Sequence, residues 1–215
     1  MTISNGAGIV GGAIITAEGS ELIAKSVTFS SNTAQVVGGA IFAMSSNVEL
    51  VGVTMFINNS AGNSGGAIFA EYCWISWSGM TSLERNQGQN GGALFLYNDV
   101  VVLNQGTTYF ASNNAVFNGG AIDGSSGMME TFYGHSLLIA NGSMILMNNT
   151  CGGNGGAIDL TGIFFVGNGS VSFIGNSAVS FGGALYAYQA NVGPSLIGAE
   201  FSHNIAEAGG AVFFS

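Results

Sequence analysis

Residues 173–186 read FIGNSAVSFGGALY, and the pattern within this stretch recurs along the whole chain. It consists of Phe-x-x-Asn-x-Ala, a short polar bridge, and Gly-Gly-Ala followed by Ile, Leu or Val. The Gly-Gly pair begins at positions 11, 38, 65, 91, 119, 155, 182 and 209, so the intervals are 27, 27, 26, 28, 36, 27 and 27 residues. Tandem repetition with a period of about 20–50 residues is typical of solenoids, in which each repeat packs only on its neighbours.

An asparagine stands five or six residues before each Gly-Gly pair, and we align these asparagines as one column. Its members are Asn5, Asn32, Asn59, Asn86, Asn113, Asn149, Asn176 and Asn204. Three residues before each Asn lies a bulky apolar residue, except in the first unit, where Thr2 takes this position. Stacked about 4.8 Å apart, such asparagines can bond to the backbone and to the next coil. We therefore predict a structural asparagine ladder beside a core of stacked apolar side chains.

Each unit contains three apolar segments of strand length, separated by turns rich in Gly, Asn and Ser. No unit carries the 3.6-residue periodicity or the capping signals of a helix. We predict an all-β fold, a right-handed parallel β-helix of about eight coils with three parallel sheets, as a single domain over residues 1–215. The longest interval predicts a loop insertion around residues 124–136.

Charge is scarce and one-sided, because Lys25 and Arg85 stand against eleven Asp and Glu residues and the net charge is −9. Nucleic-acid binding needs a basic surface that neutralises phosphates, so we exclude nucleic acid as a partner. No apolar run reaches the roughly 18 residues of a spanning helix, so we expect no membrane-spanning segment. No signal peptide is visible at the N-terminus, and no motif calls for a cofactor, so we expect none.

The pairing of F-x-x-N with G-G-A-[ILV] resembles the repeats of the chlamydial polymorphic outer membrane proteins. Both halves of the motif occur at Phe29–Asn32 with Gly38–Ile41, at Phe56–Asn59 with Gly65–Ile68, and at Phe173–Asn176 with Gly182–Leu185. In that family the repeats form the surface-exposed passenger of autotransporters and serve in adhesion. The resemblance therefore implies an extracellular or cell-surface location. We expect no counterpart of the family's C-terminal membrane barrel in this chain.

Two acids, Asp123 and Asp159, occupy the same column in neighbouring coils, three residues after the second Gly of each pair. Stacked carboxylates about 5 Å apart repel, and such a pair can bind a cation or act as acid and base on a polysaccharide. The alternative is two solvated acids on an outer face, which the lack of Lys or Arg in nearby columns favours. Glu130 and His135, in the predicted insertion, either join these carboxylates or belong to a plain surface loop. We expect no catalytic residue.

In most other coils the same column is aromatic. These aromatic residues are Phe42, Phe69, Phe95, Tyr186 and Phe213. Because the column alternates with core aliphatics and also accepts Asp, we expect it to face outward as a candidate interaction stripe for a glycan, a receptor or another copy of the chain. The alternative is that loops or neighbouring turns cover it.

Four Asn-x-Ser/Thr sequons are possible glycosylation sites if the source is a eukaryote that secretes the protein. They begin at Asn58, Asn141, Asn148 and Asn168.

The chain begins and ends within a repeat, which predicts either a segment of a longer array or open ends that pair with other copies. Open ends, scarce charge and the aromatic stripe favour an extracellular structural or adhesive repeat protein that self-associates end to end into a filament or surface appendage. Two alternatives stay open. One is a polysaccharide-active β-helix enzyme, a lyase or hydrolase, that uses Asp123 and Asp159. The other is a host-receptor adhesin passenger domain that binds its ligand through the insertion.

Overall fold

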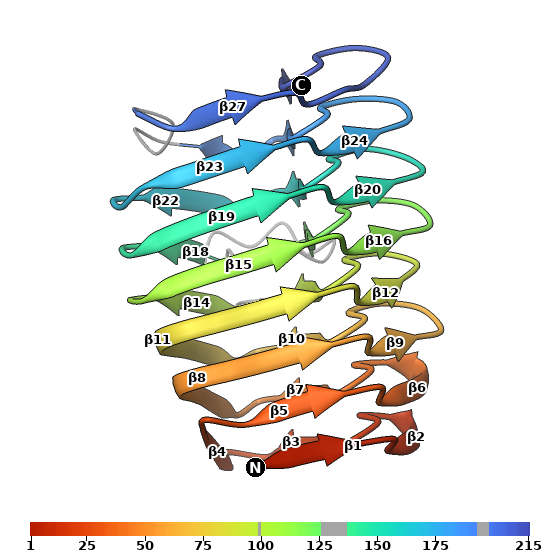
Figure 1. Cartoon of the computed structure of the whole chain (residues 1–215), viewed down its shortest axis with the longest axis vertical. Coiled ribbons are helices and arrows are strands. Elements are labelled where there is room, and N and C mark those ends of the chain that lie inside the picture. The colour runs from red at the N-terminus through yellow and green to blue at the C-terminus, as the bar shows by residue number, and fades with distance from the viewer. Residues whose placement is uncertain (99, 126–136, 193–197) are drawn as a thin grey trace.

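The chain is a stack of coils, seen here in a computed structural model that describes residues 1–98, 100–125, 137–192 and 198–215. Within these ranges it forms strands and turns but no helix, arranged as a parallel β-solenoid of about seven turns with three parallel sheets (Figure 1). The chain rises from the N-terminus to the C-terminus as the front strands run from left to right, so the coil is right-handed (Figure 1). The predicted fold class is confirmed. The predicted insertion at 124–136 lies outside the described residues except for its first two positions.

Each coil contributes strands to three sheets, which we call the bent sheet, the arm sheet and the back sheet. The bent sheet contains β1 (Thr2–Ser4), β4 (Glu21–Lys25), β5 (Thr28–Ser30), β8 (Asn47–Ile57), β11 (Trp74–Glu84), β14 (Val101–Asn104), β15 (Thr107–Ala111), β18 (Leu137–Ala140), β19 (Ser143–Met147), β22 (Phe164–Gly167), β23 (Val171–Ile174), β26 (Asn191–Val192) and β27 (Glu200–Ser202). The arm sheet contains β2 (Ala7–Val10), β6 (Thr33–Val37), β9 (Ser60–Ala61), β12 (Gln87–Gly88), β16 (Asn114–Ala115), β20 (Thr150–Cys151) and β24 (Ser177–Ala178). The back sheet contains β3 (Ile14–Ala17), β7 (Ile41–Met44), β10 (Ile68–Glu71), β13 (Leu94–Tyr97), β17 (Ile122–Ser125), β21 (Ile158–Thr161), β25 (Leu185–Tyr188) and β28 (Val212–Phe214).

The bent sheet has two halves that meet at a corner. β8 and β11 pass through this corner as single strands, whereas later coils use two shorter strands, such as β14 followed by β15. Side chains alternate along each strand, so that every second residue points into the stack and the others point outward. The core therefore fills the space between the two halves of the bent sheet and the back sheet, and the arm sheet projects to one side (Figure 1).

Columns of like residues fill this core. Phe29 and Phe56 are fully buried and stack with ring centroids 4.8 Å apart and planes 8° apart, which is close to the spacing of parallel strands. Facing them, Ile41 and Ile68 pair in register within the back sheet and are also fully buried. Burying a side chain of this size contributes about 1.5–3 kcal/mol, so the stabilisation grows with each coil that is added to the stack.

The two residues of each Gly-Gly pair are required for different reasons, as the pair at 65–66 illustrates. Gly65 has a φ of +67°, in the left-handed region that residues with a Cβ rarely adopt. Gly66 has no positive φ, but a Cβ added to it would collide with the backbone oxygen of Gly92 in the next coil and would lie 2.5 Å from the backbone oxygen of Gln87. The first glycine therefore makes the turn, and the second lets neighbouring coils approach each other.

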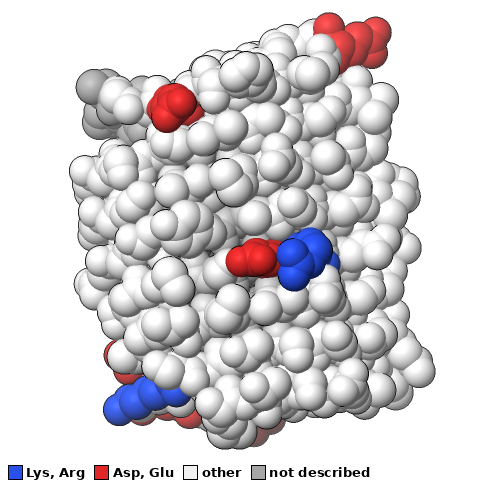
Figure 2. Space-filling view, in the orientation of Figure 1, with Lys and Arg blue, Asp and Glu red and all other residues white. Residues whose placement is uncertain are grey.

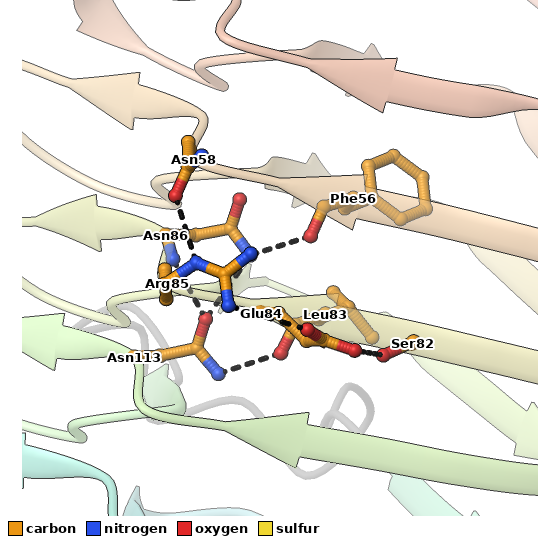
Figure 3. A network of polar contacts seen from close by, with 8 residues as sticks. All are labelled: Phe56, Asn58, Ser82, Leu83, Glu84, Arg85, Asn86 and Asn113. Atoms are coloured by element: carbon orange, nitrogen blue, oxygen red, sulfur yellow. Dashed lines mark hydrogen bonds and ion pairs between the residues drawn. The ribbon is translucent and has the colours of Figure 1, made fainter. Parts of the chain in front are cut away.

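A ladder of asparagines joins the coils where the bent sheet turns into the arm sheet. The side-chain oxygen of Asn113 accepts bonds from the backbone N–H and the side-chain amide of Asn86, at 2.9 and 3.0 Å (Figure 3). The Asn113 amide in turn donates to the backbone oxygen of Leu83 at 2.8 Å and to the side-chain oxygen of Asn149 at 3.0 Å. The same pattern links Asn32, Asn59, Asn86, Asn113, Asn149, Asn176 and Asn204. Each rung thus satisfies polar groups that would otherwise be buried without a partner.

The predicted ladder member Asn5 lies outside this ladder, and the prediction was wrong for that residue. Ile3 pairs with Phe29, so the position equivalent to Asn32 is Gly6, whose N–H donates to the Asn32 side-chain oxygen at 2.9 Å. Asn5 is exposed and has a φ of +56°. The reason is a register shift between Gly8 and Val10, where the first coil is one residue shorter than the second. Counting back from the Gly-Gly pair therefore shifts the assignment by one residue.

Candidate functional site

The column predicted as an interaction stripe lies on the outer side of the back sheet, beside the arms. Strand pairing places Phe42, Phe69 and Phe95 in register in the lower coils and Tyr186 and Phe213 in register in the upper coils. Phe181, in the arm loop that follows β24, contacts the rings of Phe213 and Tyr186 with centroids 4.7 and 6.3 Å apart. The column therefore lies in the angle between the arm and the back sheet.

This aromatic column is only partly exposed. Phe69 is 8% exposed, and the other four aromatic residues are half-buried. Phe42, Phe69 and Phe95 stack with ring centroids 5.5 Å apart, and Tyr186 stacks on Phe213 at 5.8 Å. These contacts use much of the ring surface that a ligand would need. The column is therefore a narrow aromatic edge, not an open stripe.

Asp123 and Asp159 separate the two aromatic stacks, and the structure buries them. They pair in register and are 7% and 4% exposed, so the expectation of two solvated acids on an outer face was wrong. Burial raises the pKa of Asp159 from 3.8 to about 7, against a smaller lowering by its hydrogen bond with the Thr161 side chain. Burial, and then the charge of Asp159, raise the pKa of Asp123 well above its ordinary value. The pair is therefore largely protonated in mildly acidic solution.

Cys151 lies in the arm sheet near these acids. Burial raises the pKa of its thiol to about 11, so the thiol stays protonated and poorly nucleophilic near neutral pH. Cys151 packs in a small cluster with Ala115 and Ala178, where most coils have alanine. Its position is therefore that of a core residue, and we assign it no chemistry. The predicted approach of Glu130 and His135 to the acid pair concerns residues outside the described ranges and stays a prediction.

The four sequon asparagines all lie at exposed turns of the stack. Asn58, at the turn after β8, accepts a hydrogen bond of 3.1 Å from Nε of Arg85 (Figure 3). Asn168 donates to the side-chain oxygen of Asn141 at 2.8 Å, and Asn148 is exposed at the turn after β19. All four side chains are therefore accessible from solvent, while their glycosylation stays a prediction.

Sequence reasoning missed a shallow depression of about 420 Å³ on the outer side of the first half of the bent sheet. Its side chains come from three neighbouring strands, β4, β8 and β11. It is lined by Glu21, Asn47, Val48, Glu49, Trp74 and Ser76. Alternation along each strand could have placed these polar side chains and Trp74 on one outer face, once the strand register was known.

Two further features bear on binding. Within the described ranges, no group of three or more His, Cys, Asp or Glu side chains is placed to hold a metal ion. In the same part of the chain, no helix is long and apolar enough to cross a membrane.

The stacked coils, the asparagine ladder and the sparsely charged outer faces define the chain as a tandem-repeat parallel β-solenoid. The family described as Chlamydia polymorphic membrane protein (Chlamydia_PMP) repeat matches residues 26–44, 54–71 and 170–188. The resemblance drawn from the motifs is thereby confirmed in three segments, which together cover about a quarter of the chain. Each matched segment runs from the bent sheet through the arm to the back sheet, so it spans the asparagine and the Gly-Gly pair of one coil. No curated protein and no solved structure matches the chain significantly.

Proposed function

We propose that this chain is a surface-exposed, adhesive segment of a repeat protein of the polymorphic membrane protein type, located at the outer membrane or cell surface. The observation that carries the proposal is the match of three coils to that family's repeat. The family name refers to a membrane protein, and the family resemblance adds the role of a surface-exposed passenger. An extracellular location follows from the same resemblance.

The geometry suits a scaffold that presents side chains along a rigid stack. The second half of the bent sheet, which contains β5, β15, β19, β23 and the C-terminal parts of β8 and β11, faces the viewer in Figure 1. It offers a broad, nearly uncharged face (Figure 2). Val53 and Met80 are exposed on it, and its central charges, Arg85 and Glu84, pair with each other at 3.6 Å. Such a face loses little solvation energy when it meets a protein or glycan surface. Net acidity argues for partners other than nucleic acid.

The alternative of a polysaccharide-active enzyme receives little support. Its candidate acid pair, Asp123 and Asp159, is buried beside the arm, so a sugar chain could not reach the carboxylates unless the arm moved. A glycosidase needs two accessible carboxyl groups on either side of the scissile bond. We therefore keep adhesion as the proposed function and treat the enzyme as disfavoured.

Adhesion is tested with beads that carry the chain on a C-terminal linker and are applied to cultured animal cells under gentle flow. We expect several-fold more bound beads than with the same chain unfolded by heat before coupling, because adhesion requires the ordered faces of the stack. A bead coated with an unrelated acidic protein of similar charge controls for non-specific binding. Equal retention of folded, unfolded and control beads would remove the adhesive role.

Self-association is a finer proposal within the same function. The end coils expose residues whose equivalents are covered elsewhere: Ile15 is 58% exposed, whereas Phe69 in the same column is 8% exposed. A coil stacked on such an end, from flanking sequence or from another copy, would pair its backbone and cover these side chains. Sedimentation velocity from low to high micromolar concentration is expected to show an average mass that rises with concentration and a frictional ratio typical of an elongated particle. A constant monomer mass over that range would exclude end-to-end association by this chain.

A further inference from the structure

We infer that the depression on the bent sheet, centred on Trp74, is a binding site for an ammonium or guanidinium group, such as a Lys or Arg side chain of a partner protein. This inference rests on the proposed adhesive function and gives the chemistry of the partner. It concerns β4, β8 and β11 and is separate from the aromatic column and the buried acid pair.

Strand register fixes the arrangement of the side chains around Trp74. Along one row, Glu21 pairs with Asn47 and Asn47 pairs with Trp74. In the row two residues further along the strands, Glu49 pairs with Ser76. With about 4.8 Å between strands and about 6.6 Å between alternate residues, the Cα atoms of Glu21 and Glu49 lie within about 10 Å of that of Trp74, and all three residues line the same depression. A single organic cation is small enough to contact the ring and a carboxylate together.

The indole of Trp74 is unusually available. It is 49% exposed, whereas Trp77, which points inward from the same strand, is 1% exposed. The small side chain of Ser76 stands beside it, which leaves the space of the depression open against the ring. An exposed aromatic face over a polar sheet attracts cations through its quadrupole, with about 0.5–2 kcal/mol per contact.

The polar side chains around Trp74 are available as well. Within the described ranges, no side-chain hydrogen bond or ion pair joins Glu21, Asn47, Glu49 or Ser76 to another residue. The side chain of Lys25 lies further along β4, and its ammonium is not within ion-pair distance of either carboxylate. The site therefore holds two carboxylates that form no ion pair, with Lys25 as the nearest cation on the same face. Charge-assisted hydrogen bonds from a guanidinium are stronger than neutral ones, so the arrangement favours a cation over a neutral sugar.

The chain as a whole reinforces this choice. A net charge of −9 attracts basic partners over several ångströms and raises their local concentration. The exposed indole and the two carboxylates near it then bind the basic group at one defined place on the surface. A basic segment of a partner protein meets both requirements at once.

The binding test uses the emission of Trp74 in a Trp77→Phe background, where it is the only tryptophan, with circular dichroism as a check of the fold. The probes are a capped tetra-arginine peptide, a capped tetra-glutamine peptide and cellobiose. We expect a saturable change in emission with tetra-arginine only, weakening as salt rises. The double substitution Glu21→Gln and Glu49→Gln is expected to weaken binding at least tenfold, and Trp74→Ala to weaken it similarly when titrated by calorimetry in the otherwise unaltered chain.

The double substitution Glu200→Gln and Glu207→Gln is the matched control, since it removes two exposed carboxylates far along the stack from Trp74. If this control weakens tetra-arginine binding as much as the double substitution at Glu21 and Glu49 does, only the net charge matters and the site is refuted. If cellobiose binds and the double substitution at Glu21 and Glu49 has no effect, the site is a neutral saccharide platform and the inference is wrong. If tetra-arginine fails to bind while coated beads still adhere, the site falls and the adhesive function stands. If tetra-arginine binds but the coated beads do not adhere, the site stands and the adhesive function falls.

Discussion

Replacing Asn113 with Ala is expected to lower the free energy of unfolding by about 4–6 kcal/mol, one of the largest effects available from a single side chain of this protein. The substitution removes the acceptor of the Asn86 backbone N–H and the Asn86 amide, and also the donor to the Leu83 backbone oxygen. These groups are buried in the middle of the stack, where water cannot replace the lost partner without opening the coils. Each buried polar group left without a partner costs about 1–3 kcal/mol.

Urea unfolding followed by circular dichroism measures this change. Asn114→Ala is the matched control, because Asn114 is the next residue, has the same side chain and is exposed. Its side-chain amide donates one hydrogen bond, to Thr150 Oγ1 at 2.7 Å. We expect this control to change stability by less than about 1 kcal/mol. Similar losses for the two variants would mean that the ladder stabilises the stack no more than a surface contact does.

Much of the fold could be predicted from the sequence because neighbouring coils obey one rule. In a parallel stack, equivalent residues lie directly above each other, so a column of Phe, Asn or Gly-Gly in the sequence becomes a column in space. Phe29 over Phe56 and Asn86 over Asn113 follow from spacing alone. The family match at three segments depends on the same columns.

The prediction lost accuracy where the spacing changes inside a coil. Asn5 stands six residues before its Gly-Gly pair, as Asn32 does, yet the structure gives the ladder position to Gly6. A one-residue shift between Gly8 and Val10 is invisible to counting, because no local signal marks which residue is missing. Only the pairing of Ile3 with Phe29 fixes the register.

The candidate sites were harder to predict than the core, since burial outside the core depends on how the arm packs. The alternation of side chains along a strand predicts that Asp123 and Phe69 point away from the aliphatic core. It could not reveal that both side chains are largely buried in the angle beside the arm. Conversely, Trp74 has no equivalent aromatic in the two adjacent strands, where Asn47 and Val101 take its place, and the column has an aromatic again only at Phe164, three coils away. A site made by single exceptions to the repeat leaves no periodic signal.

Raising the pH from 5 to 8 is expected to destabilise the protein through Asp123 and Asp159. In the unfolded chain an Asp releases its proton near 3.8, whereas Asp159 in the folded chain retains it to about 7 and the pKa of Asp123 is also raised. Between these values the folded state binds more protons than the unfolded state, so stability falls through Asp159 as pH rises from about 4 to about 7, and the raised pKa of Asp123 adds to the fall in the same direction. For Asp159, a pKa raised from 3.8 to about 7 corresponds to about 4 kcal/mol of stability.

The melting temperature at pH 5, 6, 7 and 8 measures this effect in the wild type and in the double variant Asp123→Asn and Asp159→Asn. The variant is expected to lose most of the pH dependence and to melt higher than the wild type at pH 8, because two neutral amides can bond to each other without separating charge. Glu200→Gln, at an exposed position, serves as the control and is expected to follow the wild type. Two results together would contradict the claim that Asp123 and Asp159 are protonated in the folded protein. The double variant would be less stable than the wild type at pH 8, and millimolar calcium would stabilise the wild type at that pH. These results would favour the cation site that the stacked carboxylates first suggested.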